Sequence, residues 1–212
     1  MNMQHRSLSG VFLDALGDVR YDDRFRDIAE DNLRAATLRA RSDSRWFVLR
    51  VAYGRETSVE KSLVAIGIEA MVPVRKGPEY RRRGRIIPPS LLPVMTGYVL
   101  VRCLHSHEAM LGLKAVEHVV DVLGTCERPH MIPNDEAVGF MERALAGDFD
   151  WGKPAGFFKA GMKVRFQSGP FARMKGIIIS CREDGKGDAV IEVDMFGSRL
   201  PVLAPLAFLE KV

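Results

Sequence analysis

The side chains from which a catalytic or metal site would be built are too poorly spaced to form one. His105 and His107 are two residues apart at the start of a predicted helix, whereas helix residues that meet are three or four apart. Cys126 and His130 have the types of a nucleophile and a base, but nothing in the sequence around them would activate the thiol. Gly185-Lys186-Gly187 is typical of a hairpin turn, not of a phosphate-binding loop. We therefore predict no catalytic residues, no metal or other cofactor, and a protein that is not an enzyme.

A run of cationic side chains is better suited to binding nucleic acid. It lies between glycine and proline residues that break regular structure, so we expect an exposed loop or hairpin over residues 75–89. Arginine and lysine neutralise phosphates, and a tyrosine ring can stack on a base. The candidate nucleic-acid contacts are Arg75, Lys76, Tyr80, Arg81, Arg82, Arg83 and Arg85. A solvated loop explains the same charges, and the sequence does not decide between the two interpretations.

The composition is that of a globular protein with one or two domains. The chain has 212 residues, of which 47% are hydrophobic and 27% charged. The net charge of +4 permits a nucleic-acid partner without demonstrating one. The three cysteines are far apart, so we expect neither a disulfide framework nor a zinc site. No signal peptide or membrane span is visible, which predicts a cytoplasmic protein without membrane contacts.

Residues 96–103 are expected to form a buried central strand around which the first half of the chain is organised. The stretch is short, apolar and rich in branched and aromatic side chains, which favours a strand over a helix. Alternate side chains leave opposite faces of a strand. One layer would therefore receive Val99, Val101 and Cys103, and the other Tyr98, Leu100 and Arg102.

The neighbouring patterns predict further strands and helices that pack on this strand, in an α+β domain. The predicted strands cover residues 45–51, 69–74 and 118–123, and the predicted helices cover residues 56–66, 105–114 and 134–146. Ser106 and Asn134 are the expected N-caps of the second and third helices. The apolar stripe of the last helix is expected to consist of Val138, Met141 and Leu145.

The two ends of the chain differ from this domain. Residues 1–44 form a charged extension with a predicted helix between Asp22 and Arg41, which would dock on the first domain, fold on a partner or stay loose. Its arginines would touch nucleic acid or, more simply, form ion pairs on a solvated face. After Lys159 the pattern changes to short strands separated by glycine and proline turns, which predicts a small β-barrel. The expected organisation is an extension at 1–44, an α+β domain at 45–146, a linker at 147–158 and a β-barrel domain at 159–212.

Two sets of motifs, in order along the chain, resemble a known family. Gly161-Met162-Lys163-Val164-Arg165-Phe166, Gly169-Pro170-Phe171 and Lys175-Gly176-Ile177-Ile178 resemble the KOW motif. Trp46-Phe47-Val48-Leu49, the basic segment, Gly97-Tyr98-Val99-Leu100-Val101 and Ile132-Pro133-Asn134-Asp135-Glu136 resemble the N-terminal domain of NusG-type proteins. The resemblance covers roughly residues 45–212. It implies a NusG N-terminal-like sheet of mainly antiparallel strands flanked by helices, followed by a KOW β-barrel.

The resemblance also implies a function. Proteins of this family are transcription elongation and antitermination factors that bind RNA polymerase through the N-terminal domain and suppress pausing. Carried over by position, Trp46, Met95 and Tyr98 would bind bacterial RNA polymerase, and the basic segment would contact nucleic acid of the elongation complex. Met95 replaces a usual aromatic residue and Thr96 a usual proline, which together with the long extension points to a specialised paralogue similar to RfaH.

The barrel of such a protein recruits another factor, commonly Rho or a small-subunit ribosomal protein. Phe171, Arg173 and Phe196 are the expected contacts for that partner. Core packing is the simpler explanation of Trp46 and Tyr98 taken singly, and also of the two phenylalanines. A KOW-type RNA-binding or ribosome-associated protein that does not bind polymerase is the alternative function.

Overall fold

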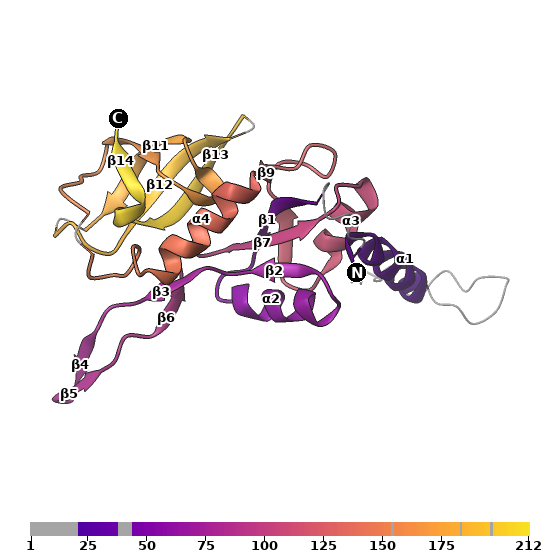
Figure 1. The fold of residues 1–212 in the computed structure, drawn as a ribbon, viewed down its shortest axis with the longest axis horizontal. Coiled ribbons are helices and arrows are strands. Elements are labelled where there is room, and N and C mark those ends of the chain that lie inside the picture. Colours follow the sequence, from indigo (N-terminus) through magenta and orange to yellow (C-terminus); the bar gives the residue numbers. More distant parts are fainter. Residues whose placement is uncertain (1–20, 38–43, 154, 183, 196) are drawn as a thin grey trace, which may run out of the picture.

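The fold consists of two five-stranded antiparallel sheets with a helix between them and a β-hairpin that projects from one side (Figure 1). The computed structural model describes residues 21–37, 44–153, 155–182, 184–195 and 197–212. The predicted contact residue Phe196 therefore lies outside the described residues. The helices are α1 (Tyr21–Thr37), α2 (Glu56–Ala65), α3 (His107–Ala115) and α4 (Asn134–Leu145). No helix among the described residues is long and apolar enough to cross a membrane.

The first sheet has the strand order β2-β7-β1-β8, with β9 also paired to β1. Its strands are β1 (Arg45–Val51), β2 (Glu69–Met71), β7 (Tyr98–Cys103), β8 (Val119–Val122) and β9 (Met131–Ile132). Strand β7 is one of the two inner strands, and it pairs with the other, β1, from Arg45↔Cys103 to Arg50↔Tyr98. Val99, Val101 and Cys103 enter one hydrophobic cluster, and Tyr98 and Leu100 enter the other. The predicted division of this strand between two layers is confirmed.

Helices α1, α2 and α3 lie on the Val99 side of the first sheet. Ser106 caps α3, because its hydroxyl accepts a hydrogen bond from the Ala109 amide at 3.0 Å, as predicted. The helix of the N-terminal extension packs on α3 over Gly112, where an added Cβ would lie 2.3 Å from the Leu33 nitrogen. Of the three expectations for this helix, docking on the first domain is the one observed.

Helix α4 lies on the opposite side of the first sheet, and two details of its prediction are wrong. Asn134 does not cap it; its side-chain oxygen accepts a hydrogen bond from Trp46 Nε1 at 3.1 Å. The buried stripe is shifted by one residue, because Ala137, Phe140 and Ala144 face inward. The predicted stripe residues Val138 and Leu145 are 42% and 82% exposed. The inward face was misassigned because the C-terminal sheet, not the first sheet alone, determines which side of α4 is covered.

The C-terminal sheet has the order β13-β12-β11-β10-β14. Its strands are β10 (Lys163–Phe166), β11 (Lys175–Cys181), β12 (Asp188–Met195), β13 (Ser198–Pro205) and β14 (Leu209–Lys211). Inward residues alternate along the strands, as in β12, where Ala189, Ile191, Val193 and Met195 are buried. The strand-rich C-terminal region is thus consistent with the expected KOW-like domain.

The two sheets share one hydrophobic cluster. It contains Trp46, Tyr98 and Phe140 from the first part of the chain and Phe166 and Phe208 from the C-terminal part. Within the segment expected to be a linker, Phe149 and Phe158 are buried in the same cluster, whereas Phe157 is 53% exposed. The C-terminal sheet is therefore docked on the rest of the protein and is not held at a distance from it.

Candidate functional site

Trp46, Met95 and Tyr98 lie on the same side of the first sheet. Trp46 comes from β1 and Tyr98 from β7, and Met95 precedes β7 in the same hydrophobic cluster. Strands β1 and β7 pair directly, so the alternation of each strand brings Trp46 and Tyr98 to one layer. We call this side, with Val48, Val94 and Leu100, the apolar face. The three residues therefore share one side of the sheet, but Trp46 pairs with Arg102 and Tyr98 with Arg50, four positions along β1.

The apolar face is covered by α4, whose Asn134 contacts Trp46, and by the C-terminal part, whose Phe171 contacts Tyr98. Trp46, Met95 and Tyr98 are only 2%, 4% and 7% exposed. The ring of Phe171, which follows β10, meets the Tyr98 ring edge-on with 5.2 Å between centroids. Phe171 is itself fully buried, so core packing describes it in this arrangement and a partner cannot reach it. Arg173 is exposed and has a positive φ of 64°.

A group of phenylalanines joins α4, the chain after it and the C-terminal sheet. The ring centroid of Phe140 in α4 lies 5.4 Å from that of Phe208. The ring centroid of Phe149 lies 5.1 Å from that of Phe208, at an interplanar angle of 83°. Phe166 of β10 also contacts Phe208, at 5.7 Å. Tilted and edge-to-face pairs at these separations are favourable beyond the area that they bury. These contacts anchor the C-terminal sheet on the N-terminal half of the molecule.

Arg75 is buried between the two halves and does not lie with the other predicted nucleic-acid contacts. Its side chain is 3% exposed and its Nη2 donates to Asp188 Oδ1 at 2.5 Å. The guanidinium also lies 5.7 Å from the Trp151 ring, which packs on Gly187. Nε and Nη1 of Arg75 have no hydrogen-bond partner among the described residues. Burying a guanidinium with unpaired donors opposes docking, so this contact is weaker than its short distance suggests.

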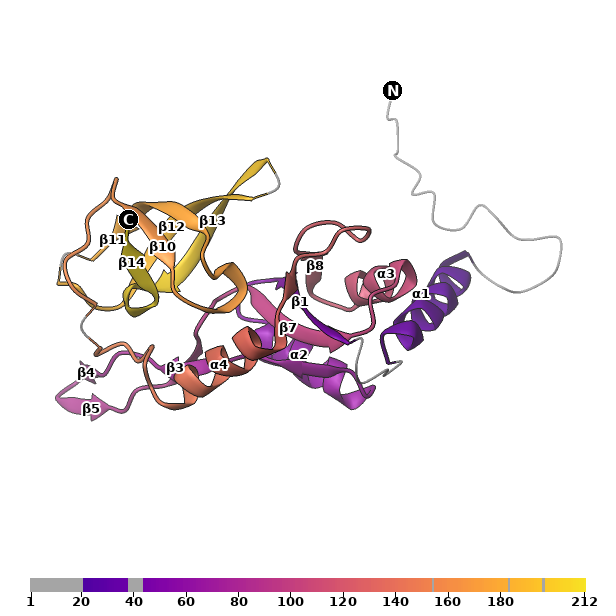
Figure 2. The ribbon, with the colours of Figure 1, turned by 45° about the horizontal axis from the view of Figure 1, so that its top comes forward.

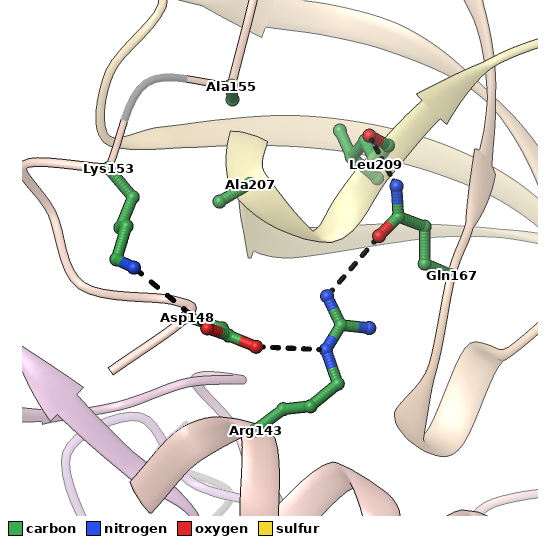
Figure 3. A pocket seen from close by; sticks show the side chains of 7 residues that line it. All are labelled: Arg143, Asp148, Lys153, Ala155, Gln167, Ala207 and Leu209. Carbon is green, nitrogen blue, oxygen red and sulfur yellow. Dashed lines mark hydrogen bonds and ion pairs between the residues drawn. The ribbon is translucent and has the colours of Figure 1, made fainter. Parts of the chain in front are cut away.

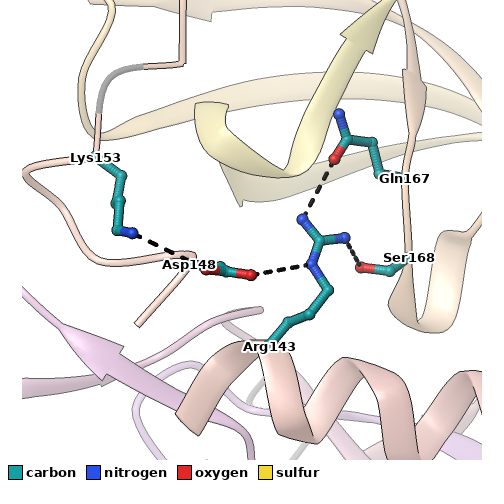
Figure 4. A network of polar contacts seen from close by, with 5 residues as sticks. All are labelled: Arg143, Asp148, Lys153, Gln167 and Ser168. Carbon is teal, nitrogen blue, oxygen red and sulfur yellow. Dashed lines mark hydrogen bonds and ion pairs between the residues drawn. The ribbon is translucent and has the colours of Figure 1, made fainter. Parts of the chain in front are cut away.

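A second polar contact centres on Arg143, near the end of α4 (Figure 4). Its Nη1 donates to Ser168 at 3.0 Å and its Nη2 to Gln167 at 3.3 Å, both from the C-terminal part. Its Nε lies 3.4 Å from Asp148, which is also 3.9 Å from Lys153 Nζ. Arg143, Asp148, Lys153 and Gln167 line a cavity of about 280 Å³ between α4 and the C-terminal sheet (Figure 3). The network orients α4 against the sheet.

Burial changes the chemistry of Tyr98. Loss of hydration raises the pKa of its phenol to about 12, and the positive charge of Arg50 opposes this shift. The phenol is therefore neutral at physiological pH and acts as an aromatic packing group. Within the described part of the chain, no three His, Cys, Asp or Glu residues are grouped so that they could hold a metal ion.

The remaining basic residues lie on an exposed arm, which we define as residues 74–93. Its base is β3 (Val74–Lys76) paired with β6 (Leu91–Pro93), and its tip is β4 (Tyr80–Arg82) paired with β5 (Arg85–Ile87). The expected single strand at 69–74 is divided, because the chain leaves β2 at Val72-Pro73 to enter the arm. Figures 1 and 2 both show the tip directed away from the sheets. The predicted exposed hairpin is confirmed.

The sequence reasoning missed Asp188, Arg143, Phe149 and Phe208 as contacts of this site. Each of them meets residues far away in the sequence, so no local pattern could reveal the pairing. The one available signal was the concentration of aromatic residues at 149–158, which a solvated linker does not need.

Comparisons with known proteins show that the first part of the chain is similar to one family. Residues 44–141 match the family described as "Transcription termination factor nusG". The "Transcription termination/antitermination protein NusG" of Vibrio cholerae is 27% identical over 184 residues, which is 79% of this chain and 96% of that protein. The protein of the same name from Escherichia coli K12 is 27% identical over 183 residues, with the same two shares covered. A solved structure described as "Domain interaction in Thermotoga maritima NusG" covers 81% of this chain and 98% of that one, with 22% identity and a TM-score of 0.42. Residues 44–141 are thus similar to the NusG family, and the chain is similar to the NusG termination/antitermination proteins over 79% of its length.

Proposed function

We propose that this protein is a transcription elongation and antitermination factor that binds bacterial RNA polymerase through the apolar face. The observation that carries the proposal is the gathering of Trp46, Met95 and Tyr98 on one side of a domain similar to the NusG family. Large apolar surfaces mark interfaces when they are uncovered. The role is non-catalytic and is exerted in the cytoplasm by suppressing pausing or termination.

The same face serves two partners in this proposal, the C-terminal sheet and the polymerase. Phe171 of the C-terminal part packs on Tyr98, so polymerase binding over the whole apolar face requires that part to leave. The incompletely paired guanidinium of Arg75 lowers the cost of this separation, because Arg75 regains water when the sheets part. Polymerase affinity is then the intrinsic affinity of the face reduced by the fraction of molecules that are open.

The C-terminal sheet recruits a further factor once it is released, with Rho or a small-subunit ribosomal protein as the proposed partner. Support comes from Phe171, which release would uncover next to the already exposed Arg173. Phe196 remains a predicted contact. In the docked arrangement Phe171 is unavailable, so we expect recruitment to follow polymerase binding.

The arm contacts nucleic acid of the elongation complex. Lys76, Tyr80, Arg81, Arg82, Arg83 and Arg85 are exposed. None of these arginines forms an ion pair with another described residue, so their charge is available for phosphates. Arg75 would join them only after it is released from Asp188.

Retention on purified bacterial RNA polymerase tests the proposal. We expect Asp188→Ala to increase retention, because it leaves Arg75 buried without its carboxylate and so favours the open form. Asp194→Ala is the matched control, since Asp194 lies on the same strand, is exposed and faces away from the core. Adding Tyr98→Ala to Asp188→Ala should remove the gain and lengthen pauses in single-round transcription. Equal retention of all four proteins would refute the proposal.

A KOW-type RNA-binding protein without polymerase binding is the second candidate. It is favoured by one observation: the basic arm is exposed while the apolar face is covered. This candidate predicts salt-sensitive RNA binding by the full chain together with no retention of Asp188→Ala on polymerase.

A further inference from the structure

The tip of the arm has two faces with different chemistry. In the β4–β5 pair, Tyr80 is opposite Ile87, Arg81 is opposite Ile86, and Arg82 is opposite Arg85. Residues opposite one another in an antiparallel pair share a face, and successive residues alternate between faces. One face therefore carries Tyr80, Arg82, Arg85 and Ile87, and the other carries Arg81 and Ile86. We call the first the tyrosine face.

The pair of residues next to the turn, on the tyrosine face, is electrostatically unfavourable in the protein without a ligand. Arg82 and Arg85 are directly opposite, next to the turn at Arg83 and Gly84, and like charges so placed destabilise a hairpin. Both are exposed, and neither is paired with a carboxylate among the described residues. An anion held between the two guanidiniums would remove the repulsion.

Folding also leaves the aromatic ring of this face unused. Tyr80 is 51% exposed, and it is absent from both hydrophobic clusters. It lies two residues before Arg82 on the same strand, which places its Cα roughly 6.6 Å from that of Arg82. A flat ring beside a pair of cations is the combination with which proteins hold an unstacked base next to its phosphate.

We propose that the tyrosine face binds single-stranded nucleic acid, with a phosphate between Arg82 and Arg85 and a base on Tyr80. This inference rests on the proposed contact between the arm and nucleic acid, and it specifies the strand state and the face. A duplex does not satisfy the face equally, because its bases are stacked on one another and offer only their edges in the grooves. A single strand offers both the phosphate and a free base surface.

Fluorescence anisotropy with the full chain tests the face. The probes are a labelled 12-nucleotide single-stranded DNA and the same sequence as a duplex. The double variant Arg82→Ala/Arg85→Ala should weaken single-strand binding about tenfold and reduce the slope of log affinity against log salt by about 0.7, the value for one phosphate. The matched comparison Arg81→Ala/Arg83→Ala removes the same charge from the same tip but keeps both guanidiniums of the tyrosine face, so it should weaken single-strand binding clearly less than Arg82→Ala/Arg85→Ala does. Equal losses in the two double variants would overturn the assignment of the face.

Two further measurements test whether the ligand is single-stranded and whether a base stacks on Tyr80. Tyr80→Ala should weaken single-strand binding by about fivefold or more, whereas Tyr80→Phe keeps the ring and should bind like the unaltered protein. Duplex binding should be unchanged by Tyr80→Ala. Duplex affinity equal to or above single-strand affinity would contradict the inference, as would a Tyr80→Phe variant as weak as Tyr80→Ala.

Polymerase retention of the same variants, measured without nucleic acid, separates this inference from the proposed function. The arm variants should be retained like the unaltered protein. Normal retention together with face-independent DNA binding would overturn only the further inference. If neither the unaltered protein nor any variant, Asp188→Ala included, were retained on polymerase, the result would instead count against the proposed function.

Discussion

The apolar face and the arm are both proposed to contact the transcription machinery, but the apolar face is buried and the arm is exposed. The apolar face is covered by α4 and by the C-terminal part, both of which lie far from Trp46 in the sequence. The arm is solvent-exposed along its tip and is built from one continuous stretch, residues 74–93. The difference shows that a large apolar surface has to be buried within the protein when its partner is absent, whereas a charged hairpin stays exposed to water without a partner. The two regions should therefore respond differently to substitution.

Among these predictions, we expect the largest effect from substitutions in the Arg75–Asp188 pair, because the two partners should change the stability of docking in opposite directions. Asp188→Ala leaves a buried guanidinium without its carboxylate and should destabilise the docked arrangement by up to about 3 kcal/mol. Arg75→Met removes the charge and its unpaired donors and should leave docking unchanged or tighter. Hydrogen exchange of residues 168–174 reports docking in both variants. Faster exchange in Arg75→Met than in Asp188→Ala would show that the pair stabilises docking in the ordinary way.

Helix α1 of the N-terminal extension covers α3, on the other side of the first sheet. Its displacement should therefore leave the apolar face buried. In Gly112→Ala the new Cβ would lie within 2.5 Å of backbone atoms of Asn32 and Leu33, so α1 must shift, at a cost of about 1–3 kcal/mol. Exchange protection of α1 should fall while polymerase retention stays constant. Gly139→Ala is the control, because it is also helical and a Cβ there meets nothing within 4 Å. Increased retention of Gly112→Ala would mean that displacement of α1 does uncover the apolar face.

Tyr98 allows the covered region to be followed by pH. Its pKa is raised to about 12 by burial, above the usual 10.0, so folding favours the neutral phenol. The corresponding stability is fully present below pH 10 and is lost as the pH rises from 10 to 12. Tyr98→Phe cannot ionise there and should lose less stability in chemical denaturation across this interval.

Substitutions in the arm should have the smallest effect on folding. Removal of Arg81, Arg82, Arg83 or Arg85 should change the free energy of unfolding by no more than about 0.5 kcal/mol, since these exposed side chains have no partners among the described residues. Removing either member of the Arg82–Arg85 pair should, if anything, stabilise the hairpin. Denaturant titration checks both statements, and a loss of more than 1 kcal/mol would show that the arm has a structural role.

The same contrast explains what the sequence could and could not predict. The alternation along β7, the Ser106 cap and the exposed hairpin follow from neighbouring residues and were predicted. The inward side of α4, the role of Asn134 and the burial of Arg75 depend on where the C-terminal sheet docks. Trp46 illustrates the limit: its type and position indicated the apolar face, but its partner Asn134 lies 88 residues away. Local patterns predict elements, and the docking of elements decides which side chains are free.

Hydrogen exchange of the full chain, alone and saturated with RNA polymerase, tests most directly whether one face serves both the C-terminal sheet and the polymerase. With polymerase bound, the account predicts faster exchange in residues 168–174, around Phe171, while β1 and β7 around Trp46 and Tyr98 stay protected. Unchanged protection of residues 168–174 in a stable polymerase complex would contradict it, because the C-terminal sheet would then still cover the face.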